Sequence, residues 1–162
     1  GFGGDGNDTF TATGGSSAFG GAGNDDITTT NRGNADGAEG DDTISARLVT
    51  RENVGELTGG AGQDLFRLDQ GLGTDPRLEN PPIRVTITDF EPGEDTLFFE
   101  FPDPGDITIR ESGETDSQVL LRLPDGRSIE VLLEGVVPAQ IEQNREFGFE
   151  TPTTQIGTDT DF

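Results

Sequence analysis

A short glycine- and aspartate-rich motif recurs four times in the first part of the chain and constrains the fold more than any other feature. The copies are GGDGNDTF (3–10), GGAGNDDI (20–27), GAEGDDTI (37–44) and GGAGQDLF (59–66). All have Gly at the first and fourth positions, Asp at the sixth and a large apolar residue at the eighth; Ala38 replaces Gly at the second position of the third copy. The copies begin 17, 17 and 22 residues apart, so the last interval carries an insertion around residues 47–57. This regular spacing predicts a stacked array in which each coil contributes one turn.

The composition indicates that such an array needs added positive charge. Only 29% of the 162 residues are hydrophobic, and 32 acidic residues face 10 basic ones, for a net charge of −22. Chains of this kind lie near the disordered class, because little apolar burial offsets chain entropy and self-repulsion. The simplest partners that supply positive charge are metal ions. The same charge argues against binding to nucleic acid or to an anionic membrane.

Several residue types are absent, and this excludes whole classes of chemistry. The chain has no Cys, His, Lys, Met, Trp or Tyr. Without Cys and His, this segment can have no thiol catalysis, Ser–His triad or zinc site of the usual kinds. We therefore expect no catalytic residues here, although a longer parent protein can be an enzyme, and we interpret the chain as part of such a protein. No apolar run approaches the ~20 residues of a membrane span, and no signal peptide is visible.

The four copies resemble the glycine-rich nonapeptide repeat G-G-x-G-x-D-x-U-x of the RTX family, also called the hemolysin-type calcium-binding repeat. The resemblance covers residues 1–68 and implies a parallel β-roll, in which two nonapeptides make one coil. The observed spacing of 17 residues is close to that length. The intervening segments GGSSAF, NRGNAD and RENVGE lack the motif. We therefore expect one calcium-binding edge and one degenerate edge.

Ligand chemistry and the family resemblance together predict Ca²⁺ as the cofactor. Calcium takes six to eight oxygen ligands at about 2.3–2.6 Å. Glycine tolerates positive φ, so a six-residue turn can direct several carbonyls inward while the sixth-position Asp supplies a carboxylate. Four stacked turns enclose three gaps, which predicts about three ions. The predicted metal-ligating residues of the repeats are Gly3, Gly4, Asp5, Gly6, Asp8, Gly20, Gly21, Ala22, Gly23, Asp25, Gly37, Ala38, Glu39, Gly40, Asp42, Gly59, Gly60, Ala61, Gly62 and Asp64.

Short strands should follow the four turns. The predicted strands are Thr9–Thr13, Asp26–Thr30, Thr43–Leu48 and Leu65–Leu68. Side chains alternate between the two faces of a strand. The eighth-position residues Phe10, Ile27, Ile44 and Phe66 should therefore stack inward, with Thr9 and Thr11 outside.

The pattern changes after a loop predicted at residues 69–82. Residues 83–100 resemble the I-x-D-F-x-x-G-x-D-x-(I/L) segment that closes RTX blocks, and they predict two strands around the Glu91-Pro92-Gly93 turn. Two interpretations of Asp89 and Asp95 stay open: they bind one more ion, or they are solvated turn acids. Residues 106–133 predict three more strands, the last two joined by a turn at Pro124-Asp125-Gly126.

The expected organisation is a calcium-binding roll (1–68), a loop (69–82), a β-rich cap (83–135) and a C-terminal tail (136–162) with a short helix at 138–146. The cap would cover the end of the array, which otherwise exposes its last apolar layer. By resemblance, about the last fifty residues carry the signal for type I export. The fold class is therefore all-β: a parallel β-roll followed by a β-rich cap.

These features predict a module that folds on extracellular calcium and serves the secretion and stabilisation of a larger secreted protein. The resemblance implies the type I secretion machinery as a partner and a location outside a Gram-negative bacterium or on its surface. The alternative is an adhesin or glycan-binding accessory module of a secreted enzyme, with a glycan or surface ligand as partner. A third hypothesis is an ice-binding surface made by outward Thr and Ser residues. A flexible acidic linker is disfavoured, because linkers lack a regularly placed apolar residue.

Overall fold

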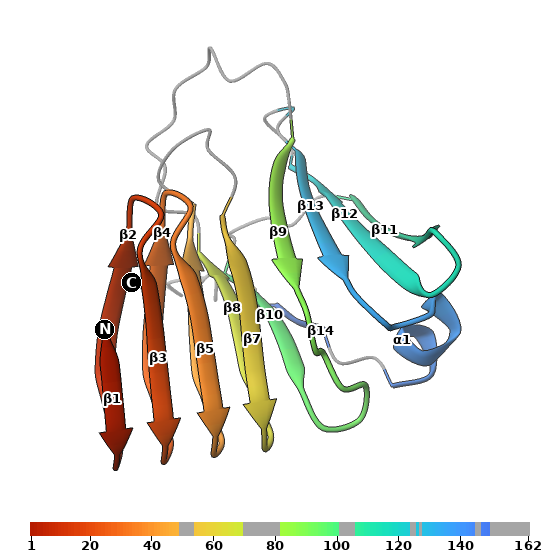
Figure 1. The fold of residues 1–162 in the computed structure, drawn as a ribbon. Coiled ribbons are helices and arrows are strands. Elements are labelled where there is room, and N and C mark those ends of the chain that lie inside the picture. Colours follow the sequence, from red (N-terminus) through yellow and green to blue (C-terminus); the bar gives the residue numbers. More distant parts are fainter. Residues whose placement is uncertain are drawn as a thin grey trace, which may run out of the picture.

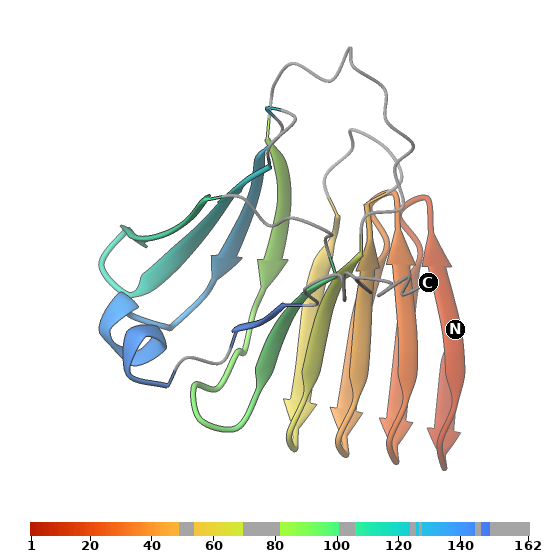
Figure 2. The same ribbon diagram turned by 180° about the vertical axis from the view of Figure 1, so that it is seen from behind.

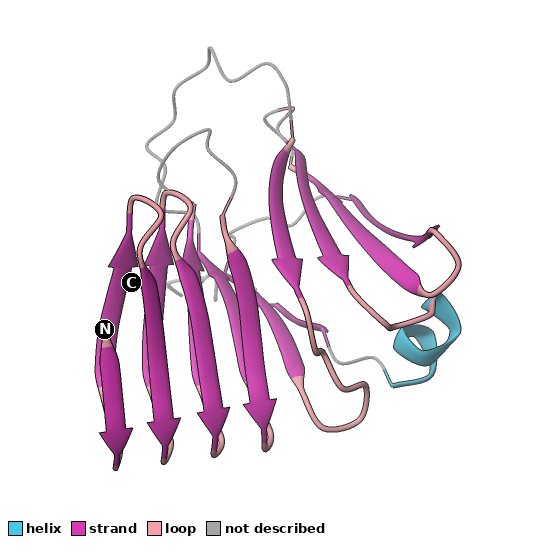
Figure 3. Cartoon of the chain, viewed as in Figure 1, coloured by secondary structure: helices cyan, strands magenta, loops and turns pink. Residues whose placement is uncertain are grey.

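The computed structural model describes residues 1–48, 54–69, 82–100, 106–123, 126, 128–144 and 147–149. Within them the chain forms two β-sheets and one short helix, so the predicted all-β class is confirmed (Figure 3). None of the described helical residues forms a segment suited to crossing a bilayer.

The first sheet has eight strands. In spatial order these are β1 (Phe2–Asp5), β3 (Ser17–Ala22), β5 (Asn34–Glu39), β7 (Glu56–Ala61), β9 (Ile83–Ile87), β13 (Ser128–Leu133), β12 (Asp116–Arg122) and β11 (Asp106–Ser112). The second sheet has six strands. In order these are β14 (Phe147–Phe149), β10 (Thr96–Glu100), β8 (Leu65–Asp69), β6 (Thr43–Arg47), β4 (Asp26–Thr30) and β2 (Thr9–Thr13).

Successive strands from β1 to β10 alternate between the two sheets, and neighbours within each sheet run parallel. Each pair of strands, such as β3 and β4, therefore makes one coil, and the coils stack side by side (Figures 1 and 2). This arrangement confirms the predicted parallel β-roll. It also extends further than the four motif copies, because β9 and β10 continue both sheets as a fifth coil.

The four strands predicted after the turns are present, with ends that differ by at most one residue. Their register places Phe10, Ile27, Ile44 and Phe66 in one row. Ile27, Ile44 and Phe66 have no exposed surface, so the inward ladder is confirmed. Phe10 is only half-buried because it belongs to the first coil, which no other described coil covers.

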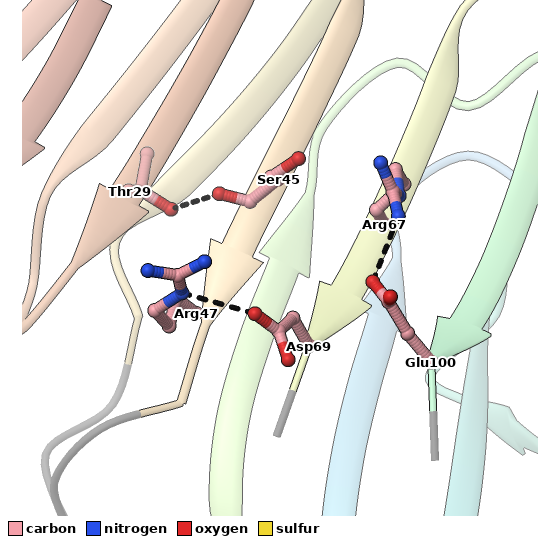
Figure 4. Close-up of polar contacts among 6 residues, drawn as sticks. All are labelled: Thr29, Ser45, Arg47, Arg67, Asp69 and Glu100. Atoms are coloured by element: carbon pink, nitrogen blue, oxygen red, sulfur yellow. Dashed lines mark hydrogen bonds and ion pairs between the residues drawn. The ribbon is translucent and has the colours of Figure 1, made fainter. Parts of the chain in front are cut away.

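The second sheet also packs a row of smaller residues inward, and one of them is polar. Thr29 is fully buried between Ala12 and Ala46 in register. Its hydroxyl donates to the Ser45 carbonyl oxygen at 3.4 Å (Figure 4). This bond satisfies a hydroxyl that would otherwise be costly to bury.

Ion pairs join coils on the outer face of the second sheet. Arg47 contacts Asp69 at 2.9 Å, and Arg67 contacts Glu100 at 2.8 Å (Figure 4). The two arginine side chains are 54% and 36% exposed. Exposed pairs of this kind contribute at most about 1 kcal/mol each. The stacking therefore depends mainly on the core and on backbone hydrogen bonds.

Beyond the roll, β13, β12 and β11 extend the first sheet as an antiparallel meander. The predicted pairing of β12 with β13 is confirmed; Pro124 and Asp125 of its turn lie outside the described residues. A short helix, α1 (Pro138–Asn144), follows as predicted, and β14 pairs with β10 at the end of the second sheet. Most of the predicted 69–82 loop and residues 150–162 also lie outside the described residues.

Candidate metal site

The four motif turns lie on one edge of the roll, where strands of the first sheet pass into strands of the second (bottom of Figure 1). The first three motif positions end a strand of the first sheet, and the fourth to sixth positions form the turn. All twenty metal-ligating residues predicted within the repeats therefore come together at this edge. Asp89 and Asp95 lie in a fifth turn, between β9 and β10, beside the fourth.

The sixth-position aspartates form a ladder along the stacked turns. From the second turn onward, one carboxylate oxygen (Oδ1) of the Asp accepts a hydrogen bond from the backbone N–H of the Asp in the preceding turn. The N···O distances are 2.7 Å for Asp8 to Asp25, 2.7 Å for Asp25 to Asp42, 2.9 Å for Asp42 to Asp64 and 3.0 Å for Asp64 to Asp95. All but Asp8 are at least 97% buried. The ladder therefore places a row of carboxylates inside the edge of the roll.

The other carboxylate oxygen of the first three aspartates has no such partner. Oδ2 of Asp8, Asp25 and Asp42 is buried and has no hydrogen bond from any described group. A buried charge without a partner is strongly unfavourable, because it loses its hydration and gains nothing in return. These three oxygens therefore need a positive group at their side.

A main-chain carbonyl from the next turn lies near each of these oxygens. A methyl group added to Gly20 would collide with Asp25 Oδ2 and lie 2.6 Å from the carbonyl oxygen of Gly37. The same positions in the other turns are Gly3, between Asp8 Oδ2 and the Gly20 carbonyl, and Gly37, between Asp42 Oδ2 and the Gly59 carbonyl. Each gap between motif turns thus brings together two oxygen acceptors. This crowding also explains why the first motif position is always glycine.

The pKa values of the buried aspartates show the same excess of negative charge. Burial is the largest cause that raises the pKa of Asp64 to about 6, and the charges of Asp95, Asp42 and Asp89 add to it. The hydrogen bond from the Asp42 backbone opposes the shift but does not cancel it. Burial also raises the pKa of Asp42 and of Asp95. Without a cation, the fold therefore shifts these carboxyl groups towards the protonated form.

These donors fit a hard cation such as Ca²⁺. The described residues contain no cluster of three acidic side chains suited to hold a metal. A site between two turns would instead combine one carboxylate with main-chain carbonyls. Calcium accepts mixed carboxylate and carbonyl ligands with flexible geometry, whereas zinc and copper prefer nitrogen and sulfur ligands.

The third-position residues contribute main-chain groups to the edge. The carbonyl oxygens of Ala22, Glu39 and Ala61 accept hydrogen bonds from the fourth-position N–H of the preceding copy, at 2.6–2.9 Å. The side chains of Asp5 and Glu39 are exposed. Their carboxylates therefore face solvent, away from the buried row of aspartates.

A second side-chain ladder, which the motif analysis did not predict, runs along the fifth motif position. Asn24 N–H donates to Asn7 Oδ1 at 3.0 Å, and Asp41 N–H donates to Asn24 Oδ1 at 3.3 Å. Gln63 N–H donates to Asp41 Oδ1 at 2.9 Å. This ladder runs opposite to the aspartate ladder, so each pair of turns is joined in both directions. The signal was present, because Asn, Asn, Asp and Gln all carry a side-chain oxygen.

Ala38 is the one non-glycine residue at the second motif position, and it adopts a φ of 82°. Gly4, Gly21 and Gly60 occupy the equivalent positions at 109°, 119° and 104°. Positive φ costs an L-residue about 1–2 kcal/mol. We therefore expect Ala38→Gly to stabilise the calcium-loaded protein by about 1 kcal/mol, measured by thermal unfolding.

Ala61→Gly is the matched control for this substitution. Ala61 lies at the third motif position and does not have a positive φ. At this position glycine would only increase the entropy of the unfolded chain, so the free energy of unfolding of this variant should fall by roughly 0.5–1 kcal/mol. Equal shifts in the two variants would show that Ala38 is not strained.

Comparisons with known proteins give structural similarity only. No family model and no curated protein matches the chain. Two solution structures of subunits of the mannuronan C5-epimerase of Azotobacter vinelandii are similar to it. The AlgE6R3 subunit is 18% identical, with 98% of this chain and 85% of that chain covered and a TM-score of 0.44. The AlgE6R2 subunit is 23% identical, with 93% and 92% covered and a TM-score of 0.44.

Proposed function

We propose that this chain is a calcium-binding module whose folding depends on ions held between its stacked turns. One observation carries the proposal: three buried carboxylate oxygens without hydrogen bonds, each beside a carbonyl oxygen of the next turn. In each gap, a cation could bind both the carboxylate oxygen and the carbonyl oxygen, two acceptors that otherwise lie side by side. Asp8, Asp25 and Asp42 would supply the carboxylates, and Gly20, Gly37 and Gly59 would supply carbonyls. Three such gaps correspond to the three ions predicted from the sequence.

The free energy expected from calcium binding is large enough to switch the folding of the chain at extracellular calcium concentrations. Extracellular calcium modules have dissociation constants of about 10⁻⁴–10⁻³ M. At millimolar calcium each site then stabilises the fold by about 0.4–1.4 kcal/mol, from RT ln(1 + [L]/Kd). Three sites contribute a few kcal/mol, which is comparable to the margin of a typical domain. At submicromolar calcium the same charges favour the unfolded chain.

This switch supports the proposed role in a larger secreted protein. A chain that stays unfolded inside the cell and folds outside is suited to export in an unfolded state. Export through type I machinery, a Gram-negative source and a non-catalytic role for this segment belong to the same proposal. Binding of a glycan or a surface ligand stays a prediction.

A calcium titration followed by far-UV circular dichroism tests the proposal. In chelator the chain should be largely disordered, and calcium between about 0.1 and a few millimolar should induce a cooperative strand signal. Magnesium should be much less effective, because it demands a compact octahedron at about 2.0–2.1 Å and sheds water reluctantly. A strand-rich spectrum that chelator leaves unchanged would contradict the proposal, as would equal folding in magnesium.

A further inference from the structure

The fifth turn, between β9 and β10, ends the array in a different way from the four motif turns. We infer that it is a metal-free terminator, in which hydrogen-bonded carboxylates of Asp89 and Asp95 replace the ion between the fourth and fifth turns. The inference rests on the proposed function, because it concerns which gaps of the same edge hold calcium.

Both oxygens of Asp95 already have donors. Oδ1 accepts from the Asp64 backbone N–H at 3.0 Å, and Oδ2 accepts from the Glu91 backbone N–H at 2.8 Å. In Asp8, Asp25 and Asp42 the second oxygen has no hydrogen-bond donor among the described groups. Asp95 is 3% exposed, so it is not a solvated turn acid. Backbone N–H groups thus occupy both of its oxygens, and these bonds lower its pKa, although burial and the charges of Asp89 and Glu91 raise it by more.

Asp89 attaches the fifth turn to the fourth through a second carboxylate. Strand β9 pairs with β7 only at Thr86 and Ile87 and then leaves the sheet. The Asp89 carboxylate follows and accepts from Gly59 N–H at 2.9 Å and Gly60 N–H at 2.8 Å. These bonds satisfy two backbone donors of β7 that lie beyond Leu57, its last residue paired with β9. Both oxygens of Asp89 are therefore also engaged by backbone groups.

The fourth gap also lacks the pairing of acceptors that marks the other three. A methyl group placed on Gly59 would meet, as its three nearest atoms, only side-chain atoms of Asp64. At Gly3, Gly20 and Gly37 the nearest atoms include a carbonyl oxygen of the following turn. In the fourth gap Asp64 Oδ2 occupies the place of the other three carboxylate oxygens, but no carbonyl oxygen is among the three nearest atoms and Asp64 Oδ2 is not among the buried oxygens without a hydrogen bond.

This arrangement lets the array end without an ion at its last turn. The loop between β9 and β10 lies beside the turn that follows β7 (Figure 1). Its contacts to the fourth turn include backbone N–H to carboxylate bonds, which need no ion of their own. The number of ions is then set by the gaps between motif turns. Asp89 and Asp95, predicted as ligands or solvated acids, have the third role of holding the cap on the roll.

Calcium stoichiometry of the full chain tests this inference. Equilibrium dialysis at saturating calcium, with folding checked by circular dichroism, should give three ions for the wild type. Asp95→Asn keeps one acceptor and removes the other, so it should lower the melting temperature but still bind three ions. Asp89→Asn should behave in the same way and serves as the second variant if Asp95→Asn does not fold. Asp42→Asn is the contrast and should bind fewer than three ions.

Four ions in the wild type would overturn the inference, as would the loss of an ion in Asp95→Asn or Asp89→Asn. A wild-type chain that binds no calcium would overturn the proposed function itself, so the two failures are distinguishable. Three ions in the wild type and in either terminator variant support the inference.

Discussion

Removal of residues 83–162 should leave the rest of the chain unable to fold, even at saturating calcium. Strands β9 and β10 cover the end of the roll, with Ile87 opposite Leu57, Leu97 opposite Phe66 and Phe99 opposite Leu68 in register. Leu57, Phe66 and Leu68 have no exposed surface in the complete fold. Truncation would expose one face of each of them and remove the carboxylate acceptors of Asp89 and Asp95.

Calcium binding should contribute too little free energy to compensate for the apolar burial that the truncated chain loses. A fully buried Val, Ile, Leu or Phe side chain contributes roughly 1.5–3 kcal/mol, and the lost strands bury at least six such residues themselves. Three ions contribute only a few kcal/mol at millimolar calcium. Residues 1–82 must also offset about 1–2 kcal/mol of backbone entropy for each ordered residue with a small core of Ala, Ile, Leu and Phe.

Circular dichroism of residues 1–82 in a calcium titration checks this expectation. A chain of residues 1–149, which retains every described strand, is the control and should fold with the midpoint of the full chain. A cooperative calcium-induced transition in residues 1–82 at that same midpoint would show that the cap is dispensable.

The motif region was predictable because each copy carries its signals within a few residues. Glycine, aspartate and the eighth-position apolar residue fix the turn, and the repeat fixes the neighbours of Ile27 and Ile44. The strands of the first sheet were harder to see. Strand β5 reads NADGAE and offers only Ala35 as an inward apolar residue. Glycines carry no side chain that could reveal the alternation of a strand.

The fifth coil was predictable as strands but not as part of the roll. Residues 83–100 lack the Gly-rich turn, so local sequence indicates two strands and not their sheets. Their places follow from contacts distant in sequence, such as Thr58 with Thr88 at 2.8 Å and Asp64 with Asp95. The ladder of aspartates likewise depends on which carboxylate oxygen faces the neighbouring turn. Only the register of the stacked coils determines that.

Asp42→Asn should stabilise the calcium-free fold and, in the same protein, weaken its response to calcium. Burial raises the pKa of Asp42, and the charges of Asp25, Asp41 and Asp36 raise it further, so the ionised carboxylate opposes folding at neutral pH. Asparagine keeps an oxygen for the Asp25 N–H and removes the charge. Without a metal ion, removal of this charge should therefore increase the stability of the fold. With calcium it removes a charged ligand from one of the proposed sites.

The midpoints of two folding transitions, one induced by an osmolyte without calcium and one induced by calcium, measure the opposing effects of Asp42→Asn. In chelator, the concentration of trimethylamine N-oxide that induces strand signal should fall, since this osmolyte favours compact states. In calcium titrations, the midpoint should rise several-fold. Asp26→Asn is the matched control, because Asp26 is exposed and the substitution changes the net charge equally. It should leave both midpoints nearly unchanged.

Acidification of the calcium-free wild type should act in the same direction as Asp42→Asn. The pKa of Asp64 rises from 3.8 to about 6 in the fold, so stability is fully present below the lower value and is lost as the pH rises through about 6. The chain in chelator should therefore contain more strand at pH 5 than at pH 7.5. If Asp42→Asn instead destabilised the calcium-free and the calcium-bound protein alike, Asp42 would be a structural hydrogen-bonding residue and not a ligand. Opposite signs require a carboxylate that the fold tolerates only beside a cation.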